Sequence, residues 1–279
     1  MSNSPPRAGV PGIREVIVSR VGTADRRDLV AVEEPMEVRV NSSSFAVIMR
    51  TPGADRDLAA GFLLAEDVVR TADEIGAIEY CQEVTDEGRD NTINVTVTGD
   101  AMTRLTERLA ERRQVMMTSS CGLCGRRTIE SLQARVTAVD GAWTVSADII
   151  ASLPDRLRQS QAVFESTGGL HAAGLFDRSG VLQLSAEDVG RHNAVDKIVG
   201  RTLLAGKHPL SQSLLLVSGR TSFELVQKAL LAGIPLIAAV SAPSSLAVDL
   251  AEQSGITLCG FVRSRQFNIY SHRTRITED

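Results

Sequence analysis

Apolar runs alternate with amphipathic stretches through the last third of this 279-residue chain. The elements predicted from that alternation are strands at 213–217, 234–240 and 256–260, helices at 223–232 and after Ser245 as far as Gln253, and a final strand at 267–270. A strand–helix–strand order joins parallel strands through right-handed crossovers, with the helices covering the sheet. The sequence therefore predicts an α/β fold with a mostly parallel sheet.

Polar turns rich in Ser, Gly and Thr follow two of these strands, at 218–222 and 241–245, and each turn opens a helix. Ligands of parallel sheets collect at the carboxyl ends of the strands, and free amides at helix N-termini attract anions. Arg220 lies in the first turn, and Arg263 and Arg265 follow the third strand. This edge suits a phosphorylated ligand such as a nucleotide, although the same Ser and Thr residues also suit simple helix caps. Because the chain has no P-loop and no GxGxxG, ordinary ATP or NAD binding is disfavoured.

A region rich in strands precedes this alternation. Its predicted elements are strands at 14–21, 28–32, 36–40, 44–50, 75–84 and 91–97, and helices at 55–69 and 101–113. Residues 1–12 contain three prolines and two glycines and predict a disordered tail. We expect a small α+β domain at 13–113 that carries no assignable chemistry, with Cys81 as a buried apolar residue. A helix near 154–166 and a hairpin at 175–184 are predicted farther along the chain.

The segment 118–125 holds two cysteines, Cys121 and Cys124, and a glycine follows each of them. At this spacing a pair serves as half of a zinc site, as a dithiol/disulfide couple, or as a sulfur-handling nucleophile with a neighbouring thiol. A glycine-rich loop with incidental cysteines is the remaining alternative. No second half of a zinc site is visible, because the other two cysteines and the four histidines each stand alone in the sequence.

The surroundings of the pair favour a reactive thiol. A free thiol with a pKa of about 8.5 is mostly protonated at pH 7. Arg126, Arg127 and a predicted helix from Thr128 can lower that pKa by about one or two units. We therefore expect 114–127 to be a mobile loop whose thiolate reaches a partner protein and relays a sulfane sulfur.

Composition restricts the remaining function classes. The chain is 43% hydrophobic, which is ample for a packed core, and its net charge of −4 comes from interspersed signs without a nucleic-acid footprint. No apolar run of membrane-spanning length and no signal peptide is visible. Four cysteines without a regular framework indicate a reducing compartment, so we expect a cytoplasmic protein that binds neither nucleic acid nor membrane.

Seven segments, in this order, resemble the FdhD family, the sulfurtransferase accessory proteins of formate dehydrogenases. They are TPGADRDLAAGFLL at 51–64, SSCGLCG at 119–125, GGLHAAGLFD at 168–177, EDVGRHNAVDK at 187–197, SGRTSFELVQKA at 218–229, SAPSSLAVDLA at 241–251 and GFVRSRQFNIYS at 260–271. The resemblance runs from about Met36 to Tyr270. It implies a cytidine-deaminase-like C-terminal domain at 128–279, a homodimer and no structural metal.

The resemblance also implies a function. Cys121 would accept sulfur as a persulfide from a cysteine desulfurase and deliver it to the molybdenum or tungsten of a bis-molybdopterin guanine dinucleotide cofactor, which formate dehydrogenase needs for activity. Cys124 would act as a relay or a resolving thiol. The guanine nucleotide end of this bound substrate is expected at the edge already reached from the strand order, at Phe261, Val262, Arg263, Ser264, Arg265 and Gln266.

Other polar residues of these segments are candidates for the same ligand. Arg220, Ser218 and His192 are expected to contact the cofactor. The remaining candidates either line its cavity or form a structural network; they are His171, Glu187, Arg191 and Asp196. Deaminase chemistry lacks its acid, because Ala173 stands where a zinc deaminase places its glutamate. Cys259 lies in a predicted buried strand and is expected to be inert.

Two alternative functions remain open at the level of sequence. A non-catalytic chaperone would bind the cofactor and deliver it to formate dehydrogenase without covalent sulfur chemistry. A zinc enzyme of deaminase type would instead contain a bound metal.

Overall fold

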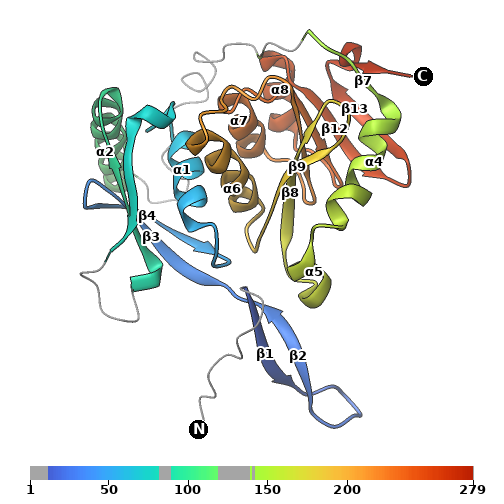
Figure 1. Ribbon diagram of the computed structural model, residues 1–279, viewed down its shortest axis with the longest axis horizontal. Helices are drawn as coiled ribbons and strands as arrows, with labels where there is room; N and C mark the ends of the chain where they lie inside the picture. The colour runs from blue at the N-terminus through green and yellow to red at the C-terminus, as the bar shows by residue number, and fades with distance from the viewer. Residues whose placement is uncertain (1–11, 82–88, 119–138, 140–141, 279) are drawn as a thin grey trace.

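The computed structural model describes residues 12–81, 89–118, 139 and 142–278, and for 111–118 it describes the backbone alone (Figure 1). None of the helices among these residues is both long enough and apolar enough to cross a membrane.

Within this part of the chain, six strands form the main sheet, in the order β13-β12-β11-β10-β8-β9. Their bounds are β8 His171–Asp177, β9 Leu182–Asp188, β10 Ser213–Val217, β11 Leu236–Ala239, β12 Thr257–Arg263 and β13 Gln266–Ser271. Strands β10, β11 and β12 are parallel, whereas β8 and β13 run antiparallel to their neighbours. Because β9 is antiparallel to β8, four of the six strands share one direction. The predicted α/β fold with a mostly parallel sheet is confirmed.

Helices cover both faces of this sheet (Figure 1). The helices on one face are α6 (Arg191–Leu204), α7 (Phe223–Leu231) and α8 (Ser245–Ser254), and α4 (Ala147–Arg158) lies on the other face beside the short strands β7 (Val145–Ser146) and β14 (Ile276–Thr277). The side chains of β10 alternate between the two layers, as expected of a strand buried on both sides. Leu215 and Val217 join the core under α6 and α7, while Leu214 and Leu216 join the core under α4.

A second sheet lies in the N-terminal part of the chain, with the strand order β4-β3-β6-β5. Its elements are β3 Glu34–Val40, β4 Ser43–Arg50, β5 Ile75–Tyr80 and β6 Thr92–Val97, with the helices α1 Asp55–Ala65 and α2 Asp100–Thr118. The hairpin of β1 (Ile13–Val18) and β2 (Arg26–Ala31) extends away from this sheet (Figure 1). Each of the six strands predicted for this region has a counterpart in the structure, with bounds that differ by a few residues. The end of the strand predicted at 75–84 lies outside the described residues.

One hydrophobic core joins the N-terminal and C-terminal parts. The buried side chains of β3, β6 and α1 belong to the same cluster as those of α6, α7 and β10. Helices α1 and α6 meet at two glycines, Gly61 and Gly200, where added side chains would strike the backbone of the facing helix. The predicted boundaries at 13–113 and 128–279 stay predictions, but the residues on either side of them share this core.

Three predicted helices have different limits in the structure, and the first of them, predicted at 55–69, ends at Ala65. The helix predicted near 154–166 begins earlier, at Ala147, because Ser146 accepts a hydrogen bond from the Asp148 amide and caps it. That helix ends at Arg158, and a separate helix α5 occupies Ala162–Thr167. Helix α2 continues to Thr118, so the first residues expected in the mobile loop 114–127 are helical in backbone.

Candidate functional site

The β12–β13 hairpin carries the six residues expected to hold a nucleotide. Three of its non-glycine residues, Phe261, Ser264 and Arg265, have a positive φ, which costs free energy in an L-residue. Strand β12 also departs from regular pairing with β13 between Gly260 and Arg263. The hairpin therefore has an irregular backbone at the carboxyl end of a parallel strand, where α/β sheets bind ligands.

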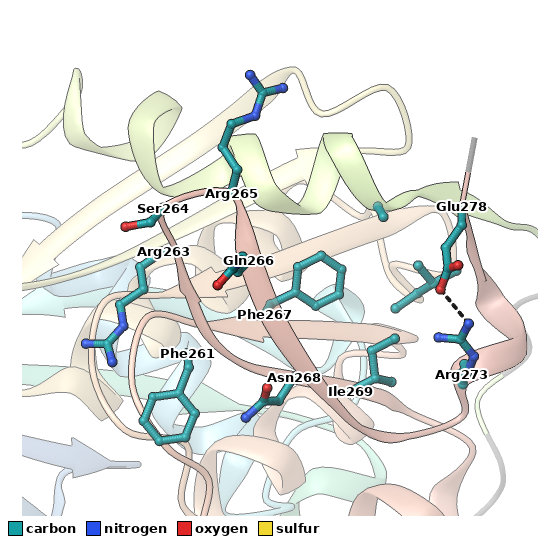
Figure 2. A pocket seen from close by; sticks show the side chains of 12 residues that line it. Phe261, Arg263, Ser264, Arg265, Gln266, Phe267, Asn268, Ile269, Arg273 and Glu278 are labelled. Atoms are coloured by element: carbon teal, nitrogen blue, oxygen red, sulfur yellow. Dashed lines mark hydrogen bonds and ion pairs between the residues drawn. The ribbon is translucent and has the colours of Figure 1, made fainter.

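A pocket of about 800 Å³ lies against this hairpin (Figure 2). Its walls come from the hairpin, from the start of α4 and from the C-terminal segment; they are Ala147, Phe261, Arg263, Ser264, Arg265, Gln266, Phe267, Asn268, Ile269, Arg273, Ile276 and Glu278. Five of the six expected residues line it. The sixth, Val262, is fully buried in the core beneath α4, so its side chain does not line the pocket.

The pocket combines basic and aromatic groups. The Arg263 guanidinium lies 5.7 Å from the centre of the Phe261 ring, in cation–π range. Arg265 is 79% exposed and lies 3.7 Å from Asp148, which is also exposed, so water screens their attraction. Arg273 pairs with Glu278 across the far end of the pocket (Figure 2). Three arginines against one glutamate favour an anionic ligand, and the aromatic rings offer faces for a flat base.

The polar turn after β10 holds two more expected residues. The Ser218 hydroxyl accepts a hydrogen bond from the Ala172 amide and so joins the turn to β8. Arg220 is exposed and makes no hydrogen bond or ion pair with any described residue. His192, at the start of α6, places Nε2 3.0 Å from the Ser222 hydroxyl and 3.4 Å from Glu224. None of these three lines the hairpin pocket, so the structure divides the expected site into two groups.

His171 and Arg191 lie together over Gly219 in the same turn. A Cβ placed on Gly219 would be 3.3 Å from His171 Nδ1 and 3.4 Å from Arg191 Cδ, so both side chains approach this backbone closely. Partial burial lowers the pKa of His171, and the positive charge of Arg191 lowers it further, while Asp188 opposes the shift. His171 is therefore held mostly neutral near pH 7.

Most charged residues of the segment 187–197 form a structural network. Glu187 accepts hydrogen bonds from the Val163 and Phe164 amides at the start of α5. The buried pair Asp196 and Lys228 is separated by 2.7 Å and joins α6 to α7. Of the two interpretations left open for Glu187 and Asp196, the structural one describes the contacts observed.

The same segment also holds the N-terminal part of the chain in place. Asp188 is fully buried, lies 2.7 Å from Lys197 Nζ and accepts a hydrogen bond from the Thr51 amide. Lys197 in turn donates to the Thr51 carbonyl, and Asn193 donates to the Met49 carbonyl. We call these contacts of Asp188, Asn193 and Lys197 with Met49 and Thr51 the Asp188 clamp, and the sequence analysis did not predict it. The signal that could have revealed it is the density of charge beside the apolar residues of 187–197, matched by the polar TPGAD turn.

The cysteine predictions divide between described and undescribed residues. Cys121 and Cys124 lie outside the described residues. Cys259 is fully buried, and burial raises its pKa to about 12, so this thiol is unreactive as expected. Cys81 is half-buried rather than fully buried. Among the described residues, no three His, Cys, Asp or Glu side chains come together as a metal site.

The chain was compared with known proteins and solved structures. The FdhD/NarQ family model matches residues 31–277. The "Sulfur carrier protein FdhD" of Streptomyces avermitilis is 51% identical over 272 residues, with 94% of each chain covered. The protein of the same name from Nocardia farcinica is 47% identical, again with 94% of each chain covered.

A solved structure supports the same assignment. A crystal structure from Desulfotalea psychrophila, assigned by its description to the formate dehydrogenase accessory proteins, superposes with a TM-score of 0.73 at 26% identity. The match covers 95% of this chain and 98% of that chain. With a family model spanning nearly all of the chain and relatives of about half identity over the same length, the chain belongs to the FdhD/NarQ family.

Proposed function

We propose that this chain is a sulfur carrier that accepts sulfane sulfur on Cys121 from a cysteine desulfurase and transfers it to a bis-molybdopterin guanine dinucleotide cofactor, on molybdenum or tungsten, for formate dehydrogenase. The observation that carries the proposal is the match, over 94% of the chain, to relatives named "Sulfur carrier protein FdhD". The sequence supplies the thiol pair that such a carrier needs, at Cys121 and Cys124.

The sulfur step requires only a thiolate on this chain. The Cys121 thiolate would attack the outer sulfur of the desulfurase persulfide, forming a new S–S bond while the desulfurase thiolate leaves. Cys124 would then act in one of two ways. As a resolving thiol it would attack the inner sulfur of Cys121, so that sulfide is released and a Cys121–Cys124 disulfide balances the two electrons taken up. As a relay it would take the outer sulfur itself.

The hairpin pocket is the proposed site for the nucleotide end of the substrate. Arg263, Arg265 and Arg273 supply positive charge for a diphosphate, and Phe261 and Phe267 line the same walls and could hold a base. A pocket of about 800 Å³ is large enough for a nucleotide-sized ligand.

The sulfur step is tested by intact-protein mass spectrometry. Wild type, Cys121→Ala and Cys124→Ala are each incubated with a cysteine desulfurase and cysteine. We expect wild type and Cys124→Ala to gain about 32 Da per sulfur, removable by reductant, and Cys121→Ala to gain nothing. Cys259→Ala is the matched control, because that thiol is fully buried and its loss should leave the adduct unchanged.

Each other outcome points to a different carrier. An adduct that persists in Cys121→Ala and disappears in Cys124→Ala would move the sulfur to Cys124. If wild type gains no mass while the desulfurase demonstrably turns over, the sulfur-carrier proposal is wrong.

The alternative function is a cofactor-binding chaperone without sulfur chemistry. The observation that favours it is the basic pocket, whose described lining holds the arginines and aromatic rings that a nucleotide would need. The two functions separate in a double variant, Cys121→Ala/Cys124→Ala, assayed for activation of formate dehydrogenase. A chaperone keeps its effect in this variant, whereas a sulfur carrier loses it.

Replacement of Arg263 by methionine tests the nucleotide site. Since a charge-assisted hydrogen bond contributes about 1.5–3 kcal/mol, we expect the Kd for GDP to rise at least about tenfold. Arg26→Met is the control, because it removes the same charge from an exposed side chain of β2 that does not line the pocket. Isothermal titration calorimetry measures both. Equal affinities in the two variants would place the nucleotide elsewhere.

The partners follow from the same proposal. A cysteine desulfurase would be the sulfur donor, the formate dehydrogenase catalytic subunit the recipient, and the cytoplasm the compartment. The resemblance also implies a homodimer, which light scattering on the purified chain would establish.

A further inference from the structure

Two arginines and a histidine lie together at the carboxyl end of β10, and neither arginine forms an ion pair with a described residue. Arg191, the first residue of α6, has a buried Nε without a hydrogen-bond partner, and its guanidinium pairs with no described residue. The side chains of Arg220 and His171 likewise make no hydrogen bond with any residue that the structure describes. A buried donor without a partner costs free energy, so its presence calls for a ligand or another function.

The nearby acidic side chains are already occupied. Glu187 accepts hydrogen bonds from the first amides of α5, and Asp188 is bound by Lys197 and the Thr51 amide. Glu224 lies 3.4 Å from His192. None of these three forms an ion pair with Arg191.

The backbone at this point is also arranged for an anion. Gly219 leaves room for His171 and Arg191 to approach, since a Cβ there would lie within 3.4 Å of both side chains. Helix α6, of 14 residues, has no side-chain cap and no acidic residue in its first turn. The Asp188 carboxylate accepts a hydrogen bond from the Gly190 amide just before the helix, but it is already paired with Lys197. A second buried polar atom without a partner, Thr221 Oγ1, belongs to the same turn. The two unpartnered atoms and the start of α6 therefore all lie at the carboxyl end of β10.

We propose that His171, Arg191 and Arg220 bind a phosphate or diphosphate group at the carboxyl end of β10, as a second anion site separate from the hairpin pocket. A guanidinium offers parallel N–H donors that match phosphoryl oxygens, and a helix N-terminus adds amides and a favourable dipole. This goes beyond the proposed function, because anion binding here requires neither of the two cysteines and none of the residues that line the hairpin pocket.

Titration calorimetry of the full chain with inorganic pyrophosphate tests the site, in an Arg263→Met background because the proposed hairpin site would bind the same anion. The variants are Arg191→Met and, as the control, Arg201→Met, which removes the same charge from the same helix. We expect Arg191→Met to weaken pyrophosphate binding at least about tenfold and Arg201→Met to change it less than about twofold. We also expect Arg191→Met to unfold at the same temperature as wild type or higher, because it removes a buried unpartnered donor. A purely structural arginine would give the opposite thermal shift.

Three outcomes would overturn the proposal. These are no detectable pyrophosphate binding in the Arg263→Met background, equal losses in Arg191→Met and Arg201→Met, or a loss in Arg191→Met that accompanies a lower unfolding temperature. Sulfur loading of Cys121 and GDP binding in Arg191→Met are measured beside it. If both are retained, failure of the anion site leaves the proposed sulfur function standing. If pyrophosphate binds but Cys121 takes up no sulfur, the anion site stands without the sulfur function.

Discussion

Changing Asp188 to alanine is expected to lower the free energy of unfolding by about 3–5 kcal/mol. The carboxylate is fully buried and lies 2.7 Å from Lys197 Nζ, which is itself 5% exposed. It also accepts hydrogen bonds from the Gly190 amide and the Asn193 side chain. Removing it leaves a buried ammonium and several donors without their acceptor, and breaking a buried pair costs far more than the pair contributes when intact.

The effect is measured by urea unfolding followed by circular dichroism. Glu165→Ala is the matched control, because its pair with Arg158 is just as short, at 2.6 Å, but exposed to water. We expect that control to change the free energy of unfolding by less than about 1 kcal/mol. A double variant, Asp188→Ala/Lys197→Met, should lose less than the sum of its single variants, because no charge is then left unpaired. Losses that simply add would mean that the two side chains do not interact.

The second large effect is expected at the contact between α1 and α6. A Cβ on Gly200 would lie 1.8 Å from the Asp57 carbonyl oxygen, and a Cβ on Gly61 would lie 2.0 Å from the Asp196 carbonyl oxygen. Neither obstacle is a flexible side chain, so the helices must separate to admit a methyl group. Gly200→Ala should therefore destabilise the protein by about 3 kcal/mol, although alanine by itself favours a helix over glycine by about 1 kcal/mol.

A thermal melt reads out this prediction, with an expected drop in Tm of about 6 °C or more for a chain of this size. Gly76→Ala is the control, since its added methyl would find only ordinary contacts at 3.6 Å and beyond. Helix propensity alone predicts that alanine at position 200 raises Tm, whereas the contact with α1 predicts that it lowers Tm. The sign of the change in Tm therefore distinguishes the two effects. A Gly200→Ala protein as stable as wild type would show that α1 and α6 are not in backbone contact.

The two contacts bear on function as well as on stability. The Asp188 clamp fixes the turn at Thr51, and the glycine contact fixes α1 against α6. Helix α6 begins at Arg191, so its position sets where the basic group at the end of β10 lies.

Much of the fold was accessible from sequence because it depends on neighbours in the chain. The strands of the last third are continuous apolar runs, and the turn that joins β8 to β9 is built by Asp177, which accepts hydrogen bonds from the Ser179 and Val181 amides. Strand–helix alternation then placed Arg220 and Arg263 at the carboxyl ends of parallel strands. Each of these expectations uses periodicity or local turn chemistry, and both act over a few residues.

The composition of the site was decided by tertiary contacts. Glu187 and His192 are both polar residues of one segment, but Glu187 binds the first amides of α5 and His192 contacts the α7 segment. Val262 was expected to contact the ligand together with its neighbours, but its side chain is buried in the core while Arg263 lines the pocket. The pocket also takes Arg273 from beyond the last strand of the main sheet.

The sequence by itself determined the α/β class, the edge of the sheet that gathers polar residues, and the thiol pair at 121 and 124. Only the tertiary structure decided which charged side chains form ion pairs within the fold and which stay available to a ligand. Asp188 and Arg191 stand three residues apart, yet one is fully satisfied by Lys197 and the Thr51 amide, and the other has a buried donor without a partner. The physical reason is that a side chain's hydrogen bonds depend on residues about 140 positions away, as between Thr51 and Asp188, which packing brings together and local pattern does not encode.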